Sequence, residues 1–88
     1  MLEVRMSRHA DRALAKLDSA VARRIEAAAR QLATDPYRPR PGADIKMLHG
    51  ERNYYRVRVG EYRMFYHVFP DAKVVVVDDV RHRSHAYD

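Results

Sequence analysis

The spacing of hydrophobic residues changes along the chain, from a helical repeat in its first part to strand-like alternation later. Apolar and charged residues alternate over residues 2–6, and this alternation predicts a short half-buried strand. Ser7 follows, and its hydroxyl is a typical N-cap acceptor for the free amides of a helix. Apolar residues then recur three and four positions apart over residues 10–17 and 21–32, which predicts two amphipathic helices.

Two breaks delimit these helices. Asp18 and Ser19 separate them, and we expect this pair to cap the second helix. Pro36 disfavours helical backbone at the residue before it, so the second helix is expected to stop at residues 34–35. Residues 35–44 contain three prolines and a glycine, a composition typical of a loop with a restricted backbone.

The second half of the chain predicts three strands, over residues 54–59, 62–69 and 73–80. Gly60-Glu61 joins the first two, and glycine in the first position of a two-residue loop suits a type II′ turn. Pro70 opens the next turn. The elements together predict an α+β fold in a single domain, residues 1–88: an N-terminal strand, a helical hairpin, then a three-stranded antiparallel meander. The helices are expected on one face of a mostly antiparallel sheet.

The two-residue loop also sets the register of the hairpin, since Arg58 then pairs with Arg63 and Arg56 with Phe65. Because side chains alternate along a strand, one face of the hairpin is apolar and faces the helices. The opposite face carries Tyr54, Arg56, Arg58, Arg63, Phe65, His67 and Phe69. This face therefore combines grouped cations with aromatic rings.

The net charge points to a polyanion as partner. The chain has 17 Lys and Arg against 12 Asp and Glu, a formal charge of +5, and 14 of the cations are arginine. Two arginines opposed on a sheet cost an amount comparable to the ~0.2–1 kcal/mol that a good cross-strand pair contributes. Cations beside exposed rings suit single-stranded nucleic acid, which offers phosphates and unstacked bases. The alternative is a solvated sheet face whose arginines lean apart.

Several kinds of site are excluded or unexpected. The absence of cysteine excludes disulfides, thiolate zinc sites and a cysteine nucleophile. His82 and His85 have no third ligand nearby in sequence, and no dinucleotide or phosphate-binding motif occurs, so we expect neither metal nor cofactor. Asp78 and Asp79 are adjacent in a strand, so we expect them on opposite faces, neutralising nearby arginines. No apolar run is long enough for a membrane span and no signal segment is evident, so the expected location is the cytoplasm.

Three segments resemble the RelE/ParE superfamily of toxins from type II toxin–antitoxin systems. Residues 55–66, Tyr-Arg-Val-Arg-Val-Gly-Glu-Tyr-Arg-Met-Phe-Tyr, are similar to its signature hairpin. Residues 80–87, Val-Arg-His-Arg-Ser-His-Ala-Tyr, resemble its closing segment, and residues 45–50 resemble the lead-in to the hairpin. The order of elements and the length agree over essentially the whole chain.

The resemblance favours the RelE-like branch, whose members are ribosome-dependent endoribonucleases that cut mRNA in the A site by attack of a 2′-hydroxyl. Carried over by position, the catalytic candidates are Arg56, Arg58, Arg63, Arg83 and Tyr87. His82 is added as a candidate for proton transfer, since histidine titrates near pH 7. RNA contacts are expected from Lys46, Arg52, Tyr54, Phe65, His67 and Arg81. The implied partners are a cognate antitoxin, in a toxin–antitoxin hetero-oligomer, and the ribosome with its mRNA; no membrane is implied.

One departure from the family pattern concerns proton transfer. Some members carry lysines where this chain has Arg56 and Arg58, and arginine stays protonated, so neither residue can serve as general base. The base is then Tyr87 or one of three histidines, His67, His82 and His85. Two other functions stay open: a ParE-like, non-enzymatic inhibitor of DNA gyrase, and a small basic protein that binds RNA without cutting it.

Overall fold

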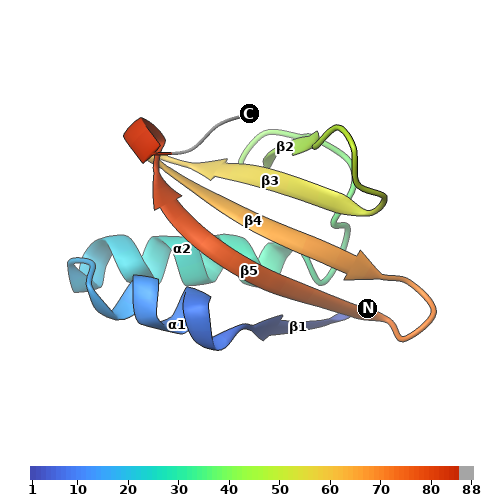
Figure 1. Cartoon of the computed structure of the whole chain (residues 1–88), viewed down its shortest axis with the longest axis horizontal. Coiled ribbons are helices and arrows are strands. Elements are labelled where there is room, and N and C mark those ends of the chain that lie inside the picture. The colour runs from blue at the N-terminus through green and yellow to red at the C-terminus, as the bar shows by residue number, and fades with distance from the viewer. Residues whose placement is uncertain (86–88) are drawn as a thin grey trace.

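A five-stranded sheet carries two helices on one of its faces (Figure 1). The computed structural model describes residues 1–85. Its elements are β1 (Glu3–Met6), α1 (Arg8–Ala15), α2 (Ser19–Gln31), β2 (Asp44–Met47), β3 (Tyr54–Val59), β4 (Tyr62–Phe69), β5 (Val74–His82) and a 3₁₀ turn (Arg83–His85). The strand order is β1-β5-β4-β3-β2, with β1 parallel to β5 and the other neighbours antiparallel. The expected α+β fold is confirmed, with a mixed sheet.

The two helices differ in how their N-termini are capped. Ser7 caps α1 as expected, since its Oγ accepts a hydrogen bond from the Ala10 amide at 3.0 Å. The same hydroxyl donates to the carbonyl oxygen of Asp78 at 2.8 Å, which ties the start of α1 to β5. Asp18 occupies the N-cap of α2, but its side chain makes no capping hydrogen bond, so the expected side-chain cap is wrong.

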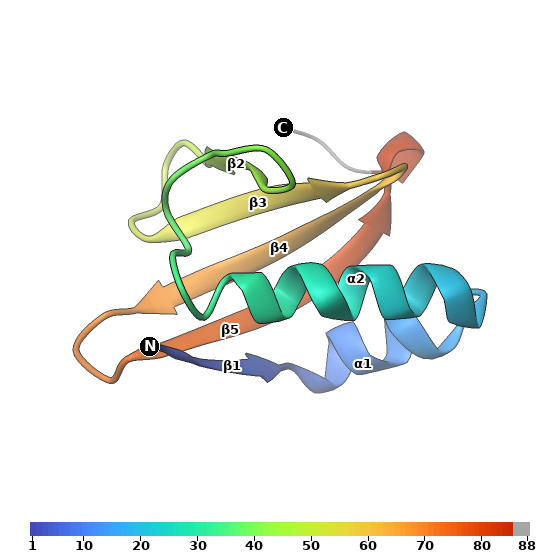
Figure 2. The same ribbon diagram turned by 180° about the vertical axis from the view of Figure 1, so that it is seen from behind.

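Helix α2 lies across the back of the sheet with α1 beside it (Figure 2). It buries Ile25 and Ala29, in agreement with the apolar stripe in the sequence. The helix ends at Gln31, earlier than the expected stop at residues 34–35. The amides of residues 32–34 bond to carbonyls three residues back, so a tighter 3₁₀-type turn replaces the last helical turn.

The central hairpin agrees with the sequence prediction in bounds, turn and register. Gly60 has φ +59°, whereas Glu61 is not in the positive-φ region, which is the combination of a type II′ turn. Arg58 pairs with Arg63 and Arg56 with Phe65. The face that carries the arginines is therefore the face turned away from the helices.

The connection between α2 and β3 contains a strand, β2, that the sequence analysis did not predict. Strand β2 pairs antiparallel with β3 and sends Ile45, 5% exposed, into the core. The predicted three-stranded meander is thus a four-stranded one, β2 to β5. A strand of four residues directly after a proline-rich loop is too short to show a clear alternation.

A β-bulge overturns the prediction that Asp78 and Asp79 face opposite sides. The β4–β5 register shifts between Phe65 and Tyr66, so Phe65 pairs with Asp79 while Tyr66 pairs with Val77. Asp78 is the extra residue, and its carboxylate contacts His67 on the open face. Both carboxylates therefore lie on the open face of the sheet.

The core lies between the helices and the apolar face of the sheet. Its largest fully buried members are Tyr66, Ile25, Leu32, Met64, Val57, Val75 and Val77, together with Pro36. The Tyr66 hydroxyl donates to the carbonyl oxygen of Pro36 at 2.6 Å and so fastens the proline-rich loop to β4. Burial raises the pKa of Tyr66 well above its usual range. Within residues 1–85, no helix has the length and apolar character needed to cross a membrane.

Candidate nucleic-acid interface

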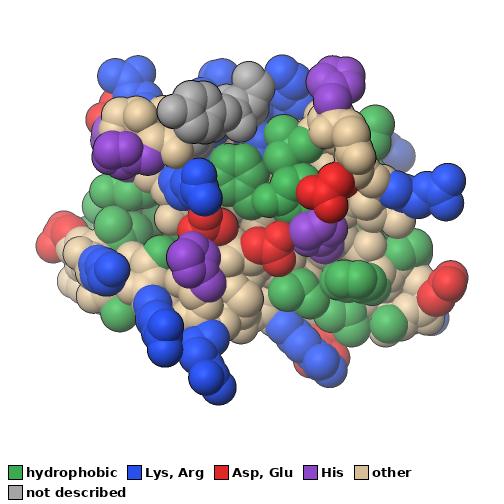
Figure 3. Space-filling model, in the orientation of Figure 1, with side chains coloured by type: hydrophobic (Ala, Val, Ile, Leu, Met, Phe, Trp, Pro, Cys, Tyr) green, Lys and Arg blue, Asp and Glu red, His purple; other side chains and the backbone are tan. Residues whose placement is uncertain are grey.

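The open face of the sheet, turned away from the helices, brings together most of the predicted site residues. Figure 3 shows this face: hydrophobic side chains lie in its middle, basic side chains lie around them, and acidic and histidine side chains lie among both. The register of β3, β4 and β5 decides which of these side chains are neighbours.

Three arginines lie next to one another across this face, one on each of three strands. Arg58 pairs with Arg63, and Arg63 pairs with Arg81. Directly paired residues have Cβ atoms about 4.5–5.5 Å apart, so the three guanidinium groups share one end of the sheet. The side chains of Arg58 and Arg81 are 49% and 50% exposed. We call these three residues the arginine row.

Carboxylates flank the arginine row on both sides. The Arg58 Nη1 atom lies 3.7 Å from Oδ2 of Asp44 on β2, and Arg81 Nε donates to Oδ2 of Asp79. Asp79 also lies 3.0 Å from Nε2 of His9 in α1. These contacts offset part of the repulsion between neighbouring cations and hold the two outer guanidinium groups in place.

The set of paired residues two positions further along the strands from the arginine row is largely buried. Arg56 is 4% exposed, and its Nη1 donates to the Asp44 carbonyl oxygen at 2.9 Å and lies 3.6 Å from Oδ1 of Asp44. Its β4 partner Phe65 is 6% exposed. Lys46, the partner of Arg56 on the edge strand β2, is exposed. Of these predicted site residues, Lys46 is open to solvent, whereas the side chains of Arg56 and Phe65 are covered by their neighbours.

After β5 the chain passes beside the β3–β4 turn. The Arg83 amide donates to the Glu61 carbonyl oxygen at 2.8 Å, and Arg83 Nε lies 3.5 Å from the Glu61 carboxylate. Arg83 is thereby held at the same end of the sheet as the arginine row. His82 instead pairs with Tyr62 on the helix-side face, with ring centroids 5.2 Å apart, so the structure does not bring it to the row. Tyr87 lies outside the described residues.

His67 lies further along β4 on the open face. Its Nδ1 is 2.7 Å from Oδ2 of Asp78, and its Nε2 is 3.7 Å from Oε1 of Glu51. The Tyr54 ring stacks on the imidazole at a centroid distance of 4.1 Å. Burial raises the pKa of Tyr54, and the charge of Asp78 adds to the effect. Asp78, which was expected to neutralise an arginine, fixes the orientation of the His67 ring instead.

A hollow of about 190 Å³ opens between the arginine row and the stacked rings. Tyr54 and Phe65 contribute aromatic surface, and Arg81 and Asp79 contribute charged groups. A planar base fits such surroundings, since its face can stack and its edge can hydrogen-bond. Within residues 1–85, no group of His, Asp and Glu side chains is arranged to hold a metal ion.

Most of the chain, including the strands of the open face, matches a known family. Residues 4–87 match the family model described as the ParE toxin of the type II toxin–antitoxin system parDE. The chain belongs to this family. The expected membership of the RelE/ParE superfamily is confirmed, and the ParE-family chain is a toxin of a toxin–antitoxin system.

Relatives of this ParE-family toxin carry the RelE name. The RelE1 protein of Methanocaldococcus jannaschii is 38% identical over 56 residues, which are 64% of this chain and 61% of that protein. The RelE–RelB complex of Pyrococcus horikoshii OT3 contains a similar chain, with 30% identity, a TM-score of 0.82 and coverage of 97% of this chain and 98% of the other. The RelBE2 toxin–antitoxin complex of Mycobacterium tuberculosis also contains a similar chain. The identity is 28%, the TM-score is 0.80, and the match covers 93% of this chain and 98% of the other.

Sequence reasoning missed two carboxylates of this toxin, Asp44 and Glu61. Asp44 meets Arg58 only because β2 pairs with β3, and that strand was not predicted. Glu61 meets Arg83 because the chain after β5 returns to the hairpin turn. Neither contact has a signal in the spacing of residues along the chain. Asp79, by contrast, neutralises Arg81 as expected.

Proposed function

We propose that this ParE-family toxin is an endoribonuclease that acts on mRNA in the ribosomal A site. The observation that carries the proposal is the arginine row, in which Arg58, Arg63 and Arg81 are neighbours on an open sheet face. Adjacent like charges destabilise a sheet, and a polyanion that binds across them reverses that cost. Cleavage by a 2′-hydroxyl forms a phosphorane whose negative charge such cations stabilise.

Within this proposal the residues divide into two groups. Arg63 and Arg83 stabilise the developing phosphorane charge, and Arg58 holds the RNA backbone. Arg56 is buried against Asp44, so it supports β2 and the neighbouring arginine rather than receiving a phosphate itself. Proton transfer is assigned to Tyr87, because His82 packs on Tyr62 at the helix-side face.

The protein partners follow from the same proposal. Relatives of this chain form RelE–RelB and RelBE2 complexes. We infer that this toxin has a cognate antitoxin, forms a hetero-oligomer with it in the cytoplasm, and is released from it to reach the ribosome. An acidic segment of the antitoxin would compete with RNA for the arginine row.

The test is cleavage of a defined message on programmed ribosomes, with the cut position mapped by primer extension. Wild type, Arg63→Ala and Arg83→Ala are compared, and Arg38→Ala in the loop before β2 serves as a control that removes the same charge away from the sheet. Cuts at the A-site codon are expected with wild type and the control, and at least a hundredfold fewer with the other two variants. Full cleavage by Arg83→Ala, or cuts that do not need ribosomes, would contradict the proposal.

A second candidate function is inhibition of DNA gyrase without catalysis. It is favoured by the ParE family model and by the carboxylates of Asp44 and Asp79, which occupy guanidinium groups that a nuclease would use. Purified toxin would then block supercoiling by gyrase while leaving programmed ribosomes and their message intact. A third result, salt-dependent RNA binding with neither effect, would indicate an RNA-binding protein.

A further inference from the structure

Four rings follow one another along the open face, starting near the arginine row. Phe65 and Tyr54 have centroids 6.4 Å apart, Tyr54 and His67 4.1 Å, and His67 and Phe69 6.3 Å. The first two pairs are stacked and the third is tilted by 33°. We call these four residues the ring track. It leads from β3 and β4 toward the turn that follows β4.

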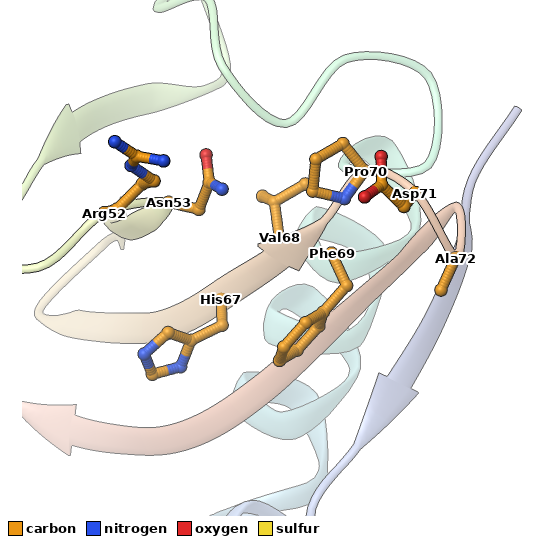
Figure 4. Close-up of a pocket in the computed structure, with 8 residues that line it drawn as sticks. All are labelled: Arg52, Asn53, His67, Val68, Phe69, Pro70, Asp71 and Ala72. Carbon is orange, nitrogen blue, oxygen red and sulfur yellow. The ribbon is translucent and has the colours of Figure 1, made fainter.

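The ring track ends at a second hollow, of about 320 Å³, drawn in Figure 4. The rings of His67 and Phe69 project from β4 next to each other, and Arg52 lies across β4 from them, on the connection before β3. Asp71, in the turn after β4, lies at the opposite end of the hollow from Arg52. The hollow thus has aromatic surface between a cation at one end and a carboxylate at the other.

Exposure distinguishes the two ends of the ring track. Phe65 is 6% exposed, whereas Phe69 is 49% exposed. A phenylalanine half open to water provides a stacking surface for a planar base at this end of the ring track, and the Arg52 guanidinium group lies at the far end of the same hollow. The carboxylate of Asp71 disfavours a phosphate at its own end, so a nucleotide would place its phosphate toward Arg52.

The distance along β4 fits a short nucleic acid strand. Phe65 and Phe69 are four residues apart, which is about 13 Å at the usual rise of a strand. The hollow at Phe69 is therefore separate from the arginine row but continuous with it through the rings of Tyr54 and His67.

We propose that the hollow at Phe69 is a nucleotide subsite, which takes one unstacked base of a single-stranded RNA whose phosphates cross the arginine row. This inference rests on the proposed function in that RNA is the ligand. It adds a contact outside the positions that the family resemblance supplied, because Phe69 was not among them. The subsite makes affinity depend on RNA length and on one base beyond the cut.

The test couples a protein variant to an RNA variant. An eight-nucleotide RNA, 2′-O-methylated so that it resists cleavage and labelled with fluorescein, is titrated with full-length toxin and followed by anisotropy. Each base is replaced in turn by an abasic residue. With wild type, one position is expected to lose about 5- to 100-fold in affinity, the range for removal of one base–aromatic stack. Phe69→Ala should bind the intact RNA weaker by the same factor and be insensitive to the abasic residue at that position.

Tyr37→Ala is the matched control, because Tyr37 is 41% exposed and its ring packs on Tyr55, at the apolar face. It should keep wild-type affinity and wild-type sensitivity to the abasic residue. Phe69→Leu, which keeps apolar volume without a ring, reproduces the loss and replaces the alanine variant if that variant unfolds. Equal affinity of Phe69→Ala and Tyr37→Ala for the RNA would overturn the subsite. The subsite would also be overturned if the loss caused by Phe69→Ala added to the loss caused by the abasic residue at every position of the RNA.

The same proteins are then assayed on programmed ribosomes, which separates the two proposals. Coupling between Phe69 and one base without any cleavage by wild type would overturn the nuclease and leave the subsite standing. Cleavage by wild type without coupling would overturn the subsite and leave the nuclease standing.

Discussion

Replacement of Tyr66 by phenylalanine tests how the proline-rich loop is held against the sheet. Tyr66 is 0% exposed and donates to the Pro36 carbonyl oxygen at 2.6 Å. Phenylalanine keeps the ring but leaves a buried carbonyl without this donor. A typical hydrogen bond contributes about 0.5–1.5 kcal/mol, and a buried group left unsatisfied costs about 1–3 kcal/mol. We therefore expect Tyr66→Phe to lower the free energy of unfolding by about 1–3 kcal/mol.

Urea unfolding followed by circular dichroism at pH 7 measures this difference. With a slope of about 1 kcal/mol per molar urea for a small domain, the midpoint should fall by about 1 M or more while the slope stays unchanged. Tyr37→Phe is the control, since this residue is 41% exposed. A Tyr66→Phe midpoint equal to that of wild type, at equal slope, would refute the reasoning.

The same variant alters the response to alkaline pH. Burial raises the pKa of Tyr66, so the unfolded chain loses this proton near pH 10 and the folded chain only at higher pH. Stability from this group is fully present below pH 10 and is lost as the pH rises toward the folded value. Tyr66→Phe should therefore lose less stability than wild type above pH 10. Part of the loss remains, because burial also raises the pKa of Tyr54 and Tyr55.

Three further predictions concern charge, turn and cap. Asp79→Asn frees the Arg81 guanidinium group and should tighten RNA binding about two- to fivefold at low salt. Fluorescence anisotropy measures the affinity, with Asp11→Asn as the control, and weaker binding by Asp79→Asn would contradict the prediction. Gly60→Ala forces an L-residue to φ +59° and should cost about 1–2 kcal/mol, seen as a lower Tm; an unchanged Tm would show that the turn relaxes. Ser7→Ala removes the N-cap of α1 and should lower the free energy of unfolding, measured in urea, by about 0.5–2 kcal/mol. A free energy of unfolding equal to that of wild type would contradict this prediction.

The parts of the fold that were predictable depend on local chemistry. Gly60-Glu61 specifies a two-residue type II′ loop, and that loop fixes which residues of β3 and β4 face each other. Ser7 caps α1 because its hydroxyl accepts a hydrogen bond from the amide three residues ahead, which is again a local relation. What the sequence did not predict involves pairing at long range. The parallel pairing of β1 with β5 joins residues about seventy positions apart, and β2 becomes a strand only because β3 pairs with it.

The candidate site divides in the same way. The arginine pair Arg58 and Arg63 follows from the hairpin register, so it was predictable. The addition of Arg81 to the row depends on the β4–β5 register, which a bulge shifts by one residue. A bulge carries no reliable sequence signal, since it is one extra residue in an otherwise regular strand. For the same reason the contact between Asp78 and His67 could not be anticipated. The burial of Arg56 could not be anticipated either, because it depends on Asp44 in the unpredicted strand β2.

The carboxylates around the arginine row reconcile two opposing demands on this toxin. Before it meets a target, the chain must fold with three cations adjacent on one sheet, and Asp44 and Asp79 reduce that repulsion. When a phosphate arrives, the same carboxylates compete with it for the guanidinium groups. Removing Asp79 should therefore raise affinity for RNA and lower the free energy of unfolding together, a trade of stability against function. Because the Arg81 side chain is half exposed, each effect should weaken as salt increases. A gain in affinity without a loss of stability would mean that Asp79 acts only on the ligand, and not on the fold.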